Sequence, residues 1–446
     1  MSRIKYHHMV NTVVPVFFLV MLLISGIYVV PYLDVPEVPY LVGVAGLAFG
    51  KQILFVCLMV MMGSTFRWRE VIGTRFTLLC CIWLLIHMVH WLLRREYDGT
   101  YLHRIVQIAF IWVFVNYIIQ QREEDRKPFL GLQVLSYQFF SIFCILVVTF
   151  SFNAEVARLI VNGFGGNRFG FSIWLSQFVF LTFFIHLNLN SKNKSILIAI
   201  IWVTPILILQ IFTGGRTGIL ASFVIFLYFA YQQGGFRVFI LSVPYLATVI
   251  FFSNNLSNMI GTSSGFSQGA EGGIGLSIFR VNDAIFSEYN LQHRNVADRL
   301  SSYRLSIITE WVDRLSSFRL SIITDAFSRA DTFSLFFGNG VENFMGKLPT
   351  GSLNHVHNIY LRALGEIGVI GFATLIAMMA LPFRIQLVNL YKCENVLQKN
   401  NTTMLVYCSV VILVGMLHSE YITTGLSTCM IFWLCYAETI RVQTAT

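Results

Sequence analysis

The chain has 446 residues, of which 56% are hydrophobic and only 12% are charged, whereas about a quarter of the residues of a soluble domain are charged. This composition excludes an ordinary soluble enzyme and indicates an integral membrane protein. The formal net charge of +9 need not indicate a nucleic-acid partner, and we expect none, because membrane proteins collect Lys and Arg in their cytoplasmic loops.

Apolar runs of about 17 to 25 residues, the length that crosses a bilayer as a helix, recur along the chain. They predict an all-α, polytopic fold with about twelve transmembrane helices. The first follows the basic start of the chain and is interpreted as a retained signal anchor. The predicted spans lie near residues 12–33, 40–62, 75–93, 103–120, 131–152, 171–189, 195–212, 217–232, 236–253, 358–383, 402–418 and 420–437.

An even number of spans puts both termini on one side of the membrane. Placing them in the cytoplasm gives about 15 Lys and Arg inside against about 6 in the short outer loops, as the positive-inside rule requires. Arg104 and Arg216 are among the outer ones. The chain then divides into a membrane domain at 1–253, a large outer loop at 254–356 and a second membrane domain at 357–446.

The outer loop is rich in arginine and contains an internal duplication. A segment that begins at Asp298 recurs at Asp313, 15 residues later. On one unbroken amphipathic helix, Arg304 and its counterpart Arg319 would lie about 22 Å apart, too far to hold one diphosphate together. The plain interpretation of most of these arginines is the solvated face of such a helix. The seven arginines of the loop are Arg280, Arg294, Arg299, Arg304, Arg314, Arg319 and Arg329.

His357 stands where the outer loop meets the next apolar run. The free N–H groups and positive dipole of a helix start keep an imidazole neutral, as a general base near neutral pH must be. The alternative is a histidine that only caps the helix. His355 is a second candidate for the base, because it lies in the same loop just before His357.

Arg216 lies in the turn Thr213-Gly-Gly-Arg-Thr-Gly between two predicted spans. Its planar fork of donors suits phosphate oxygens, and the flanking glycines allow a close approach. The alternative is an arginine in a tight turn that reaches to lipid headgroups.

Several ionisable residues fall inside the predicted spans, where a charge is unfavourable unless it is paired. His87, His90 and Glu366 lie towards the outer side, and Arg362 is placed to form an i,i+4 ion pair with Glu366. Lys51 has no assigned role. The chain has no phosphate-binding loop, Cys-x-x-Cys, His-Glu-x-x-His or Asp-x-Asp motif, so we expect neither a cofactor nor a metal.

Three segments together resemble the superfamily of bacterial O-antigen polymerases and O-antigen ligases. His357-Asn-x-Tyr-Leu-x-x-Leu-x-Glu-x-Gly-x-x-Gly371 is similar to its most recognisable motif, and Thr213-Gly-Gly-Arg-Thr-Gly-Ile-Leu resembles its arginine-containing outer turn. Ser317-Phe-Arg319 followed by Leu335-Phe-Phe-Gly-Asn-Gly340 resembles the loop arginine and Gly-x-Gly segment. The resemblance covers the second half of the chain; before about residue 200 it extends to hydropathy only.

The resemblance implies an inner-membrane enzyme with its active site facing the periplasm. Its reaction would be metal-independent, inverting glycosyl transfer from an undecaprenyl diphosphate-linked oligosaccharide, with membrane lipids and a chain-length regulator as further partners. Carried over, His357 would be the catalytic base, and Arg216 with Arg319 would bind the diphosphate. The duplication leaves Arg304 as the alternative to Arg319. Accessory site positions would be His355, Asn358, Tyr360 and Glu366.

These residues predict a surface-polysaccharide polymerase, which moves a growing glycan onto a lipid-linked repeat unit. The close alternative is a ligase that transfers the glycan to the lipid A core. A flippase is a third possibility, although the scattered Pro205, Pro244 and Pro382 lack the matched halves typical of transporters. A fourth is an assembly protein whose loop binds partners without chemistry.

Overall fold

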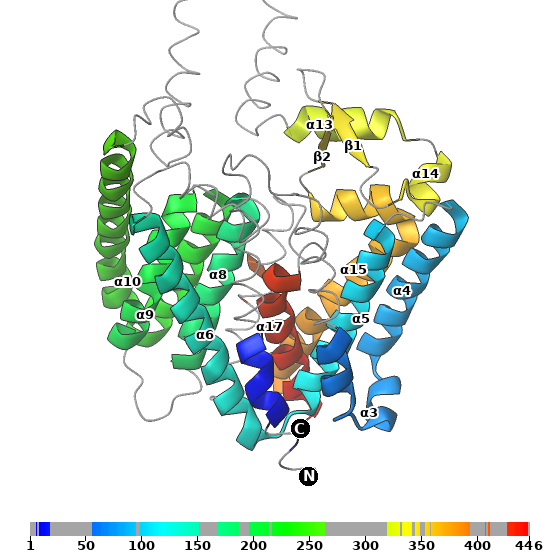
Figure 1. The fold of residues 1–446 in the computed structure, drawn as a ribbon, viewed down its shortest axis with the longest axis horizontal. Helices are drawn as coiled ribbons and strands as arrows, with labels where there is room; N and C mark the ends of the chain where they lie inside the picture. Colours follow the sequence, from blue (N-terminus) through cyan, green and yellow to red (C-terminus); the bar gives the residue numbers. More distant parts are fainter. Residues whose placement is uncertain are drawn as a thin grey trace, which may run out of the picture.

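The described part of the chain is almost entirely α-helical (Figure 1). This confirms the all-α prediction for these residues, with one short β-hairpin as an element that the sequence did not predict. The computed structural model describes residues 6, 9–17, 56–94, 99–150, 168–186, 196–213, 216–263, 319–330, 332–340, 344–347, 353–356, 358–392, 406, 409–410 and 426–444.

The helices follow the apolar runs of the sequence. Their bounds are α3 Trp68–Ile72, α4 Arg75–Arg94, α5 Gly99–Gln120, α6 Glu123–Phe150, α8 Arg168–Phe184, α9 Ile196–Thr213, α10 Arg216–Ser263, α13 Arg319–Ser328, α14 Thr332–Phe337, α15 Ile359–Lys392 and α17 Leu426–Thr444, and the strands are β1 Met345–Lys347 and β2 Leu353–His355. α10 covers two predicted spans, 217–232 and 236–253, and bends between them at Gly235, where φ is 64°.

Two of the described helices are long and apolar enough to cross a membrane, over Arg75–Leu92 in α4 and Ile359–Ile385 in α15. Shorter apolar stretches occupy Arg104–Gln120, Leu175–Phe184, Ile198–Gln210, Gly218–Gln232 and Gly235–Val249. The predicted spans 12–33, 40–62 and 402–418 lie largely outside the described residues. The count of about twelve transmembrane helices therefore stays a prediction.

Helix α4 carries apolar side chains on its outer face as well as its inner one. The helix begins directly after Thr74. The hydroxyl of Thr74 accepts a hydrogen bond from the backbone N–H of Thr77 at 3.2 Å and so caps the first turn. Leu78, Leu85 and Leu92 are 61%, 60% and 67% exposed, and their spacing puts them on one side of the helix. An uninterrupted apolar stripe of this length is unfavourable in water and suits a lipid environment.

A second outward stripe of the same kind lies on α6. Leu135, Phe139, Ile142 and Leu146 are all exposed, and they recur at the three- and four-residue steps of one helix face. α4 and α6 thus each carry an outward apolar stripe of the kind that suits lipid.

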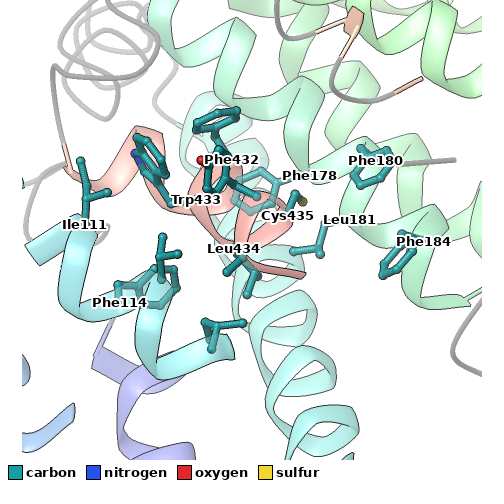
Figure 2. Packing of buried hydrophobic residues seen from close by; sticks show 14 of the residues in the cluster. Ile111, Phe114, Phe178, Phe180, Leu181, Phe184, Phe432, Trp433, Leu434 and Cys435 are labelled. Carbon is teal, nitrogen blue, oxygen red and sulfur yellow. The ribbon is translucent and has the colours of Figure 1, made fainter. Parts of the chain in front are cut away.

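The core of the bundle forms around α17. Every residue from Phe432 to Thr439 is buried, and a helix that is apolar on all sides is stable only when other helices surround it. α17 packs against α5, α8 and α15. Figure 2 shows how Ile111 and Phe114 of α5 and Phe178 of α8 meet its side chains. Tyr436 also donates its hydroxyl to the carbonyl oxygen of Met378 in α15, at 2.9 Å.

The bundle has two distinct ends (Figure 1). We call the end that holds helical residues 9–17, α3 and the C-terminal part of α17 the terminal end. We call the opposite end, which holds α13, α14, the hairpin and the start of α15, the distal end. The predicted topology, with both termini on the cytoplasmic side, stays a prediction.

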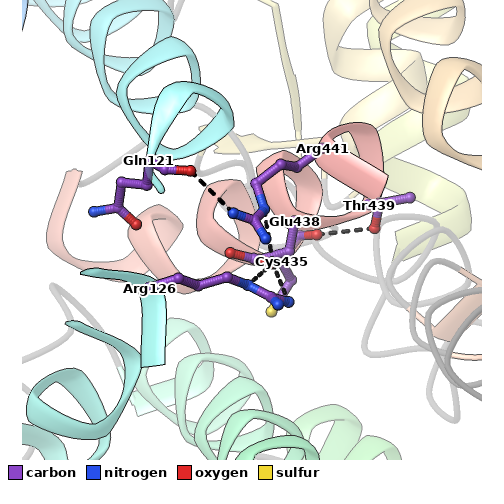
Figure 3. A network of polar contacts seen from close by, with 6 residues as sticks. All are labelled: Gln121, Arg126, Cys435, Glu438, Thr439 and Arg441. Atoms are coloured by element: carbon purple, nitrogen blue, oxygen red, sulfur yellow. Dashed lines mark hydrogen bonds and ion pairs between the residues drawn. The ribbon is translucent and has the colours of Figure 1, made fainter. Parts of the chain in front are cut away.

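A buried ionic network joins helices at the terminal end (Figure 3). Arg126 of α6 donates from Nε to Oε2 of Glu438 in α17 at 2.7 Å, and Arg441 lies 3.9 Å from the same oxygen. Arg441 also donates to the carbonyl oxygen of Gln121 at 3.1 Å. The side chains of Arg126 and Glu438 are only 11% and 2% exposed, so the network links α17 to the α5–α6 corner from within the fold.

Candidate active site

The helix that follows His357 is capped by the next residue, Asn358. Its side-chain oxygen accepts the backbone N–H groups of Tyr360 and Leu361, each at 3.0 Å. This is the geometry of an N-cap, which satisfies two donors that the first turn of a helix leaves open. The capping role, one of the two interpretations of His357, therefore belongs to Asn358.

Helix α15 is broken soon after it starts. Gly368 has φ 72° and ψ −175°, so residues 359–367 form one helical segment and residues 369–392 another. The break leaves the carbonyl oxygens at the end of the first segment without their usual partners further along the helix. The predicted span 358–383 is thus two segments, and we call residues 359–367 the entry segment.

The Gly-Asn-Gly turn at residues 338–340 docks against this break. Asn339 donates its N–H to the carbonyl oxygen of Gly365 at 2.6 Å, and Gly340 donates to Glu366 at 2.9 Å. A Cβ on Gly368 would lie 2.1 Å from the carbonyl oxygen of Phe336, so only glycine fits. The N–H groups of the turn therefore satisfy two of the carbonyl oxygens that the break leaves without helical partners.

The hairpin and α13 hold the other side of the entry segment. β1 and β2 pair antiparallel, with Met345 opposite His355. A small core beneath them joins Ile322 of α13, Phe344 and Val356, with Leu361 of the entry segment packed against it. The chain on both sides of the undescribed His357 is thus anchored, on one side by the hairpin and on the other by the cap.

The expected ion pair of the motif is present. Arg362 donates from Nε to Oε1 of Glu366 at 2.6 Å, and the two side chains are 7% and 11% exposed. A buried guanidinium and carboxylate in direct contact neutralise each other, which buried charges require. Glu366 therefore acts in the fold as the partner of Arg362, and its backbone carbonyl oxygen accepts a hydrogen bond from the N–H of Gly340.

Arg216 begins α10 at a tightly packed corner. Gln210 of α9 donates to the carbonyl oxygen of Ser172 in α8 at 2.6 Å. A Cβ on Gly218 would lie 2.4 Å from the same residue, so the glycine of the Gly-Gly-Arg-Thr-Gly motif permits this close approach. From the sequence we expected these glycines to let a ligand approach the backbone. At Gly218 the structure shows instead that a glycine is needed for α10 to pack closely on α8.

A buried polar group at α4 and α5 was not recognised from the sequence. Arg104, expected in a short outer loop, lies in α5 with only 5% exposure, and Gln107 beside it is 2% exposed. Arg104 donates to Oε1 of Gln107 at 3.2 Å and is an electrostatic neighbour of His87. The available signal was the position of Arg104 at the start of an apolar run, where an ionisable residue usually has a partner or a function.

The predicted site residues differ in how far the structure describes them. Tyr360 and Glu366 lie on the entry segment, and Asn358 directly precedes it. His355 lies in β2, Arg216 begins α10 and Arg319 begins α13, each described as backbone only. His357 and Arg304 lie outside the described residues. Among the described residues, no three His, Cys, Asp or Glu side chains are grouped to hold a metal ion.

The convergence of the predicted residues remains a prediction. α15 packs on α4, α14 and α17, whereas the corner at Arg216 is built from α8, α9 and α10. No protein-family model matches the chain, and no curated protein matches it significantly. The functional argument therefore depends on the chemistry of the motif residues and on the way the distal end holds the entry segment.

Proposed function

We propose that the chain is an O-antigen or related surface-polysaccharide polymerase of the bacterial inner membrane. It has about twelve transmembrane helices, cytoplasmic termini and an active site that faces the periplasm. It transfers a growing glycan from undecaprenyl diphosphate onto a lipid-linked repeat unit. The outward apolar stripes on α4 and α6 support a membrane environment for the bundle.

The observation that carries the proposal is the double anchoring of the segment after His357. Asn358 caps this segment, and the Gly-Asn-Gly turn is hydrogen-bonded to the far end of the same segment through Gly365 and Glu366. A catalytic base must be held in a defined position, which rigid elements on both sides provide. An assembly protein without chemistry would not need a histidine between the hairpin and this doubly held segment.

In the proposed reaction an acceptor hydroxyl oxygen attacks the anomeric carbon of the donor sugar. The new glycosidic bond forms as the bond from that carbon to the diphosphate oxygen breaks, and the electron pair leaves with the diphosphate. His357 takes the hydroxyl proton. Arg216 and Arg319 stabilise the negative charge that develops on the leaving group. The attack comes from the opposite face of the sugar, so the anomeric configuration inverts.

A ligase is the second candidate, since it shares the motif and the chemistry. It differs only in its acceptor, which would be the lipid A core. A flippase is less well supported, because a transporter would hold its charges at the middle of the membrane. The buried ion pair of Arg362 with Glu366 and the contacts of Arg329 lie instead at the distal end.

The test is the electrophoretic lipopolysaccharide profile of a deletion strain of the native host. The strain is complemented with the wild type, with His357→Ala or, as a test of the rival base, with His355→Ala, and each protein is quantified in the membrane fraction. We expect single-repeat lipopolysaccharide from the deletion and from His357→Ala, and a normal ladder from His355→Ala. Bare core with glycan left on the carrier would assign the ligase, and a ladder from His357→Ala would remove the base assignment.

A further inference from the structure

Helix α14 carries three phenylalanines that the fold leaves uncovered. Phe333, Phe336 and Phe337 are 69%, 56% and 52% exposed, and α14 contains no charged residue. Their spacing places them on one side of a helix, and the rings of Phe333 and Phe337 pack with centroids 4.7 Å apart. We call these three residues the phenylalanine face.

The phenylalanine face is fixed relative to the candidate active site. α14 packs on α15, and the carbonyl oxygen of Phe336 closely approaches Gly368 at the helix break. The next residues of the chain form the Gly-Asn-Gly turn, which is hydrogen-bonded to Gly365 and Glu366. Because backbone contacts make this connection, the face cannot move far without moving the entry segment.

The phenylalanine face continues an apolar surface that runs along the bundle. Val369 and Ile370, directly after the break, are 41% and 58% exposed. α15 packs on α4, whose outward stripe ends at the exposed Leu92. These are the two described helices that are long and apolar enough to cross a membrane. In Figure 1, α14 lies at the outer margin of the distal end, above these helices.

We infer that the phenylalanine face inserts among the acyl chains of the membrane leaflet at the distal end. The occupant is bilayer lipid, because the face continues the outward surface of α4 and α15 and carries no charge that would select a protein partner. Aromatic rings are favoured at this boundary between headgroups and acyl chains. Resting on the proposed function, the anchor would hold the entry segment at the depth of the lipid-linked diphosphate.

The test measures the depth of position 336 in the full-length protein. A fluorescent non-canonical amino acid replaces Phe336, and the protein is reconstituted in phosphatidylcholine vesicles with plain or brominated acyl chains. The matched control carries the same amino acid at Ser328, which is exposed on the neighbouring α13. Both positions tolerate the label because their side chains are exposed. We expect brominated lipid to reduce emission at position 336 on the order of twofold and to leave position 328 unchanged.

Equal emission in both kinds of vesicle at position 336 would overturn the anchor. The anchor would also be overturned if position 336 became better protected from quenching as the protein-to-lipid ratio increased, because a second copy of the chain would then cover the face. The measurement does not depend on glycosyl transfer. The anchor can therefore fail while His357→Ala still abolishes chain extension, and quenching can succeed while that variant stays active, so the two proposals are judged separately.

Discussion

The backbone N–H of Asn339 donates a 2.6 Å hydrogen bond to the carbonyl oxygen of Gly365. Asn339 lies before the motif histidine and Gly365 lies in the helix that follows it, so this bond joins the two segments that carry the motif residues. It exists because the break at Gly368 frees a carbonyl group that an unbroken helix would use internally. The two segments are therefore joined into one structural unit by backbone hydrogen bonds.

Gly368→Ala should disrupt this unit. Its φ of 72° is in the left-handed region, and a Cβ would lie 2.1 Å from the carbonyl oxygen of Phe336. The backbone strain alone costs about 1–3 kcal/mol, and the contact adds to it. We expect a lower thermal unfolding midpoint in detergent and loss of the polysaccharide ladder.

The matched control for this substitution is Gly131→Ala in α6. Nothing lies within 4 Å of a Cβ at that position, and alanine is favoured over glycine inside a helix by about 1 kcal/mol. The control should keep or slightly raise the unfolding midpoint. Equal midpoints for Gly368→Ala and the wild type would show that the loop and helix are not coupled as described.

Asn358 should act through capping. Asn358→Ala removes the acceptor of two backbone N–H groups and should destabilise the helix by about 1 kcal/mol. Asn358→Ser retains an acceptor of the right reach, so it should restore both the unfolding midpoint and chain extension. If serine restored the midpoint but not extension, the asparagine would also contact substrate, and a purely capping role would be wrong.

The pair of Arg362 and Glu366 can be tested by replacing one partner or both. Glu366→Ala leaves a buried guanidinium unpaired, which costs about 3–5 kcal/mol, whereas replacing both partners with apolar residues is often close to neutral. We expect Glu366→Ala to be poorly produced and the combination of Arg362→Met with Glu366→Leu to recover membrane levels. If the double variant made full-length polymer, both residues would have only a structural role. If it reached normal membrane levels but made no polymer, one of the two residues would take part in the reaction.

Sequence reasoning worked where one local rule decides the outcome. Long apolar runs produced the helices at 75–93, 103–120 and 195–212 within a few residues. The four-residue spacing of Arg362 and Glu366 predicted their ion pair, which is confirmed. In both cases the interacting groups lie within one helix, so no tertiary information was needed.

Features set by distant parts of the chain were not predicted. The entry segment ends at Gly368 because α14 and the Gly-Asn-Gly turn occupy the space and supply hydrogen bonds. The sequence could equally describe one continuous span there. Likewise, the burial of Arg104 beside Gln107 depends on how α4 and α5 pack, which hydropathy does not report.

The duplicated segment offers an internal comparison of its two arginines. Arg319 begins α13, whose buried Ile322 packs with Phe344 in the small core beside the hairpin. This attachment brings the start of α13 to the distal end and favours Arg319 as the diphosphate ligand over its counterpart Arg304, which is 15 residues earlier in the sequence. We expect Arg319→Ala to abolish the ladder and Arg304→Ala to keep it. The reverse result would move the assignment to the first copy.

Arg216 should need its guanidinium and not only its charge. A lysine at this position keeps the charge but lacks the planar fork that binds two phosphate oxygens. Arg216→Lys should therefore shorten or remove the ladder at unchanged membrane levels. Gln210→Ala is a useful companion variant, because it loosens the same corner through the bond to Ser172 without removing a cation. If both variants gave normal polymer, the corner would have no role in the reaction.

The network at the terminal end should govern stability and not the reaction. Glu438→Gln would leave Arg126 and Arg441 sharing a neutral amide in a nearly water-free setting (Figure 3), and an uncompensated buried charge costs about 3–5 kcal/mol. We expect a much lower unfolding midpoint and low membrane levels. Glu70→Gln is the matched control, since its pair with Arg67 is 58% and 62% exposed and such pairs contribute about 0–1 kcal/mol. Because the network lies opposite the entry segment, polymer length per folded molecule should be unchanged in both variants, and a shortened polymer from correctly folded Glu438→Gln protein would contradict that separation.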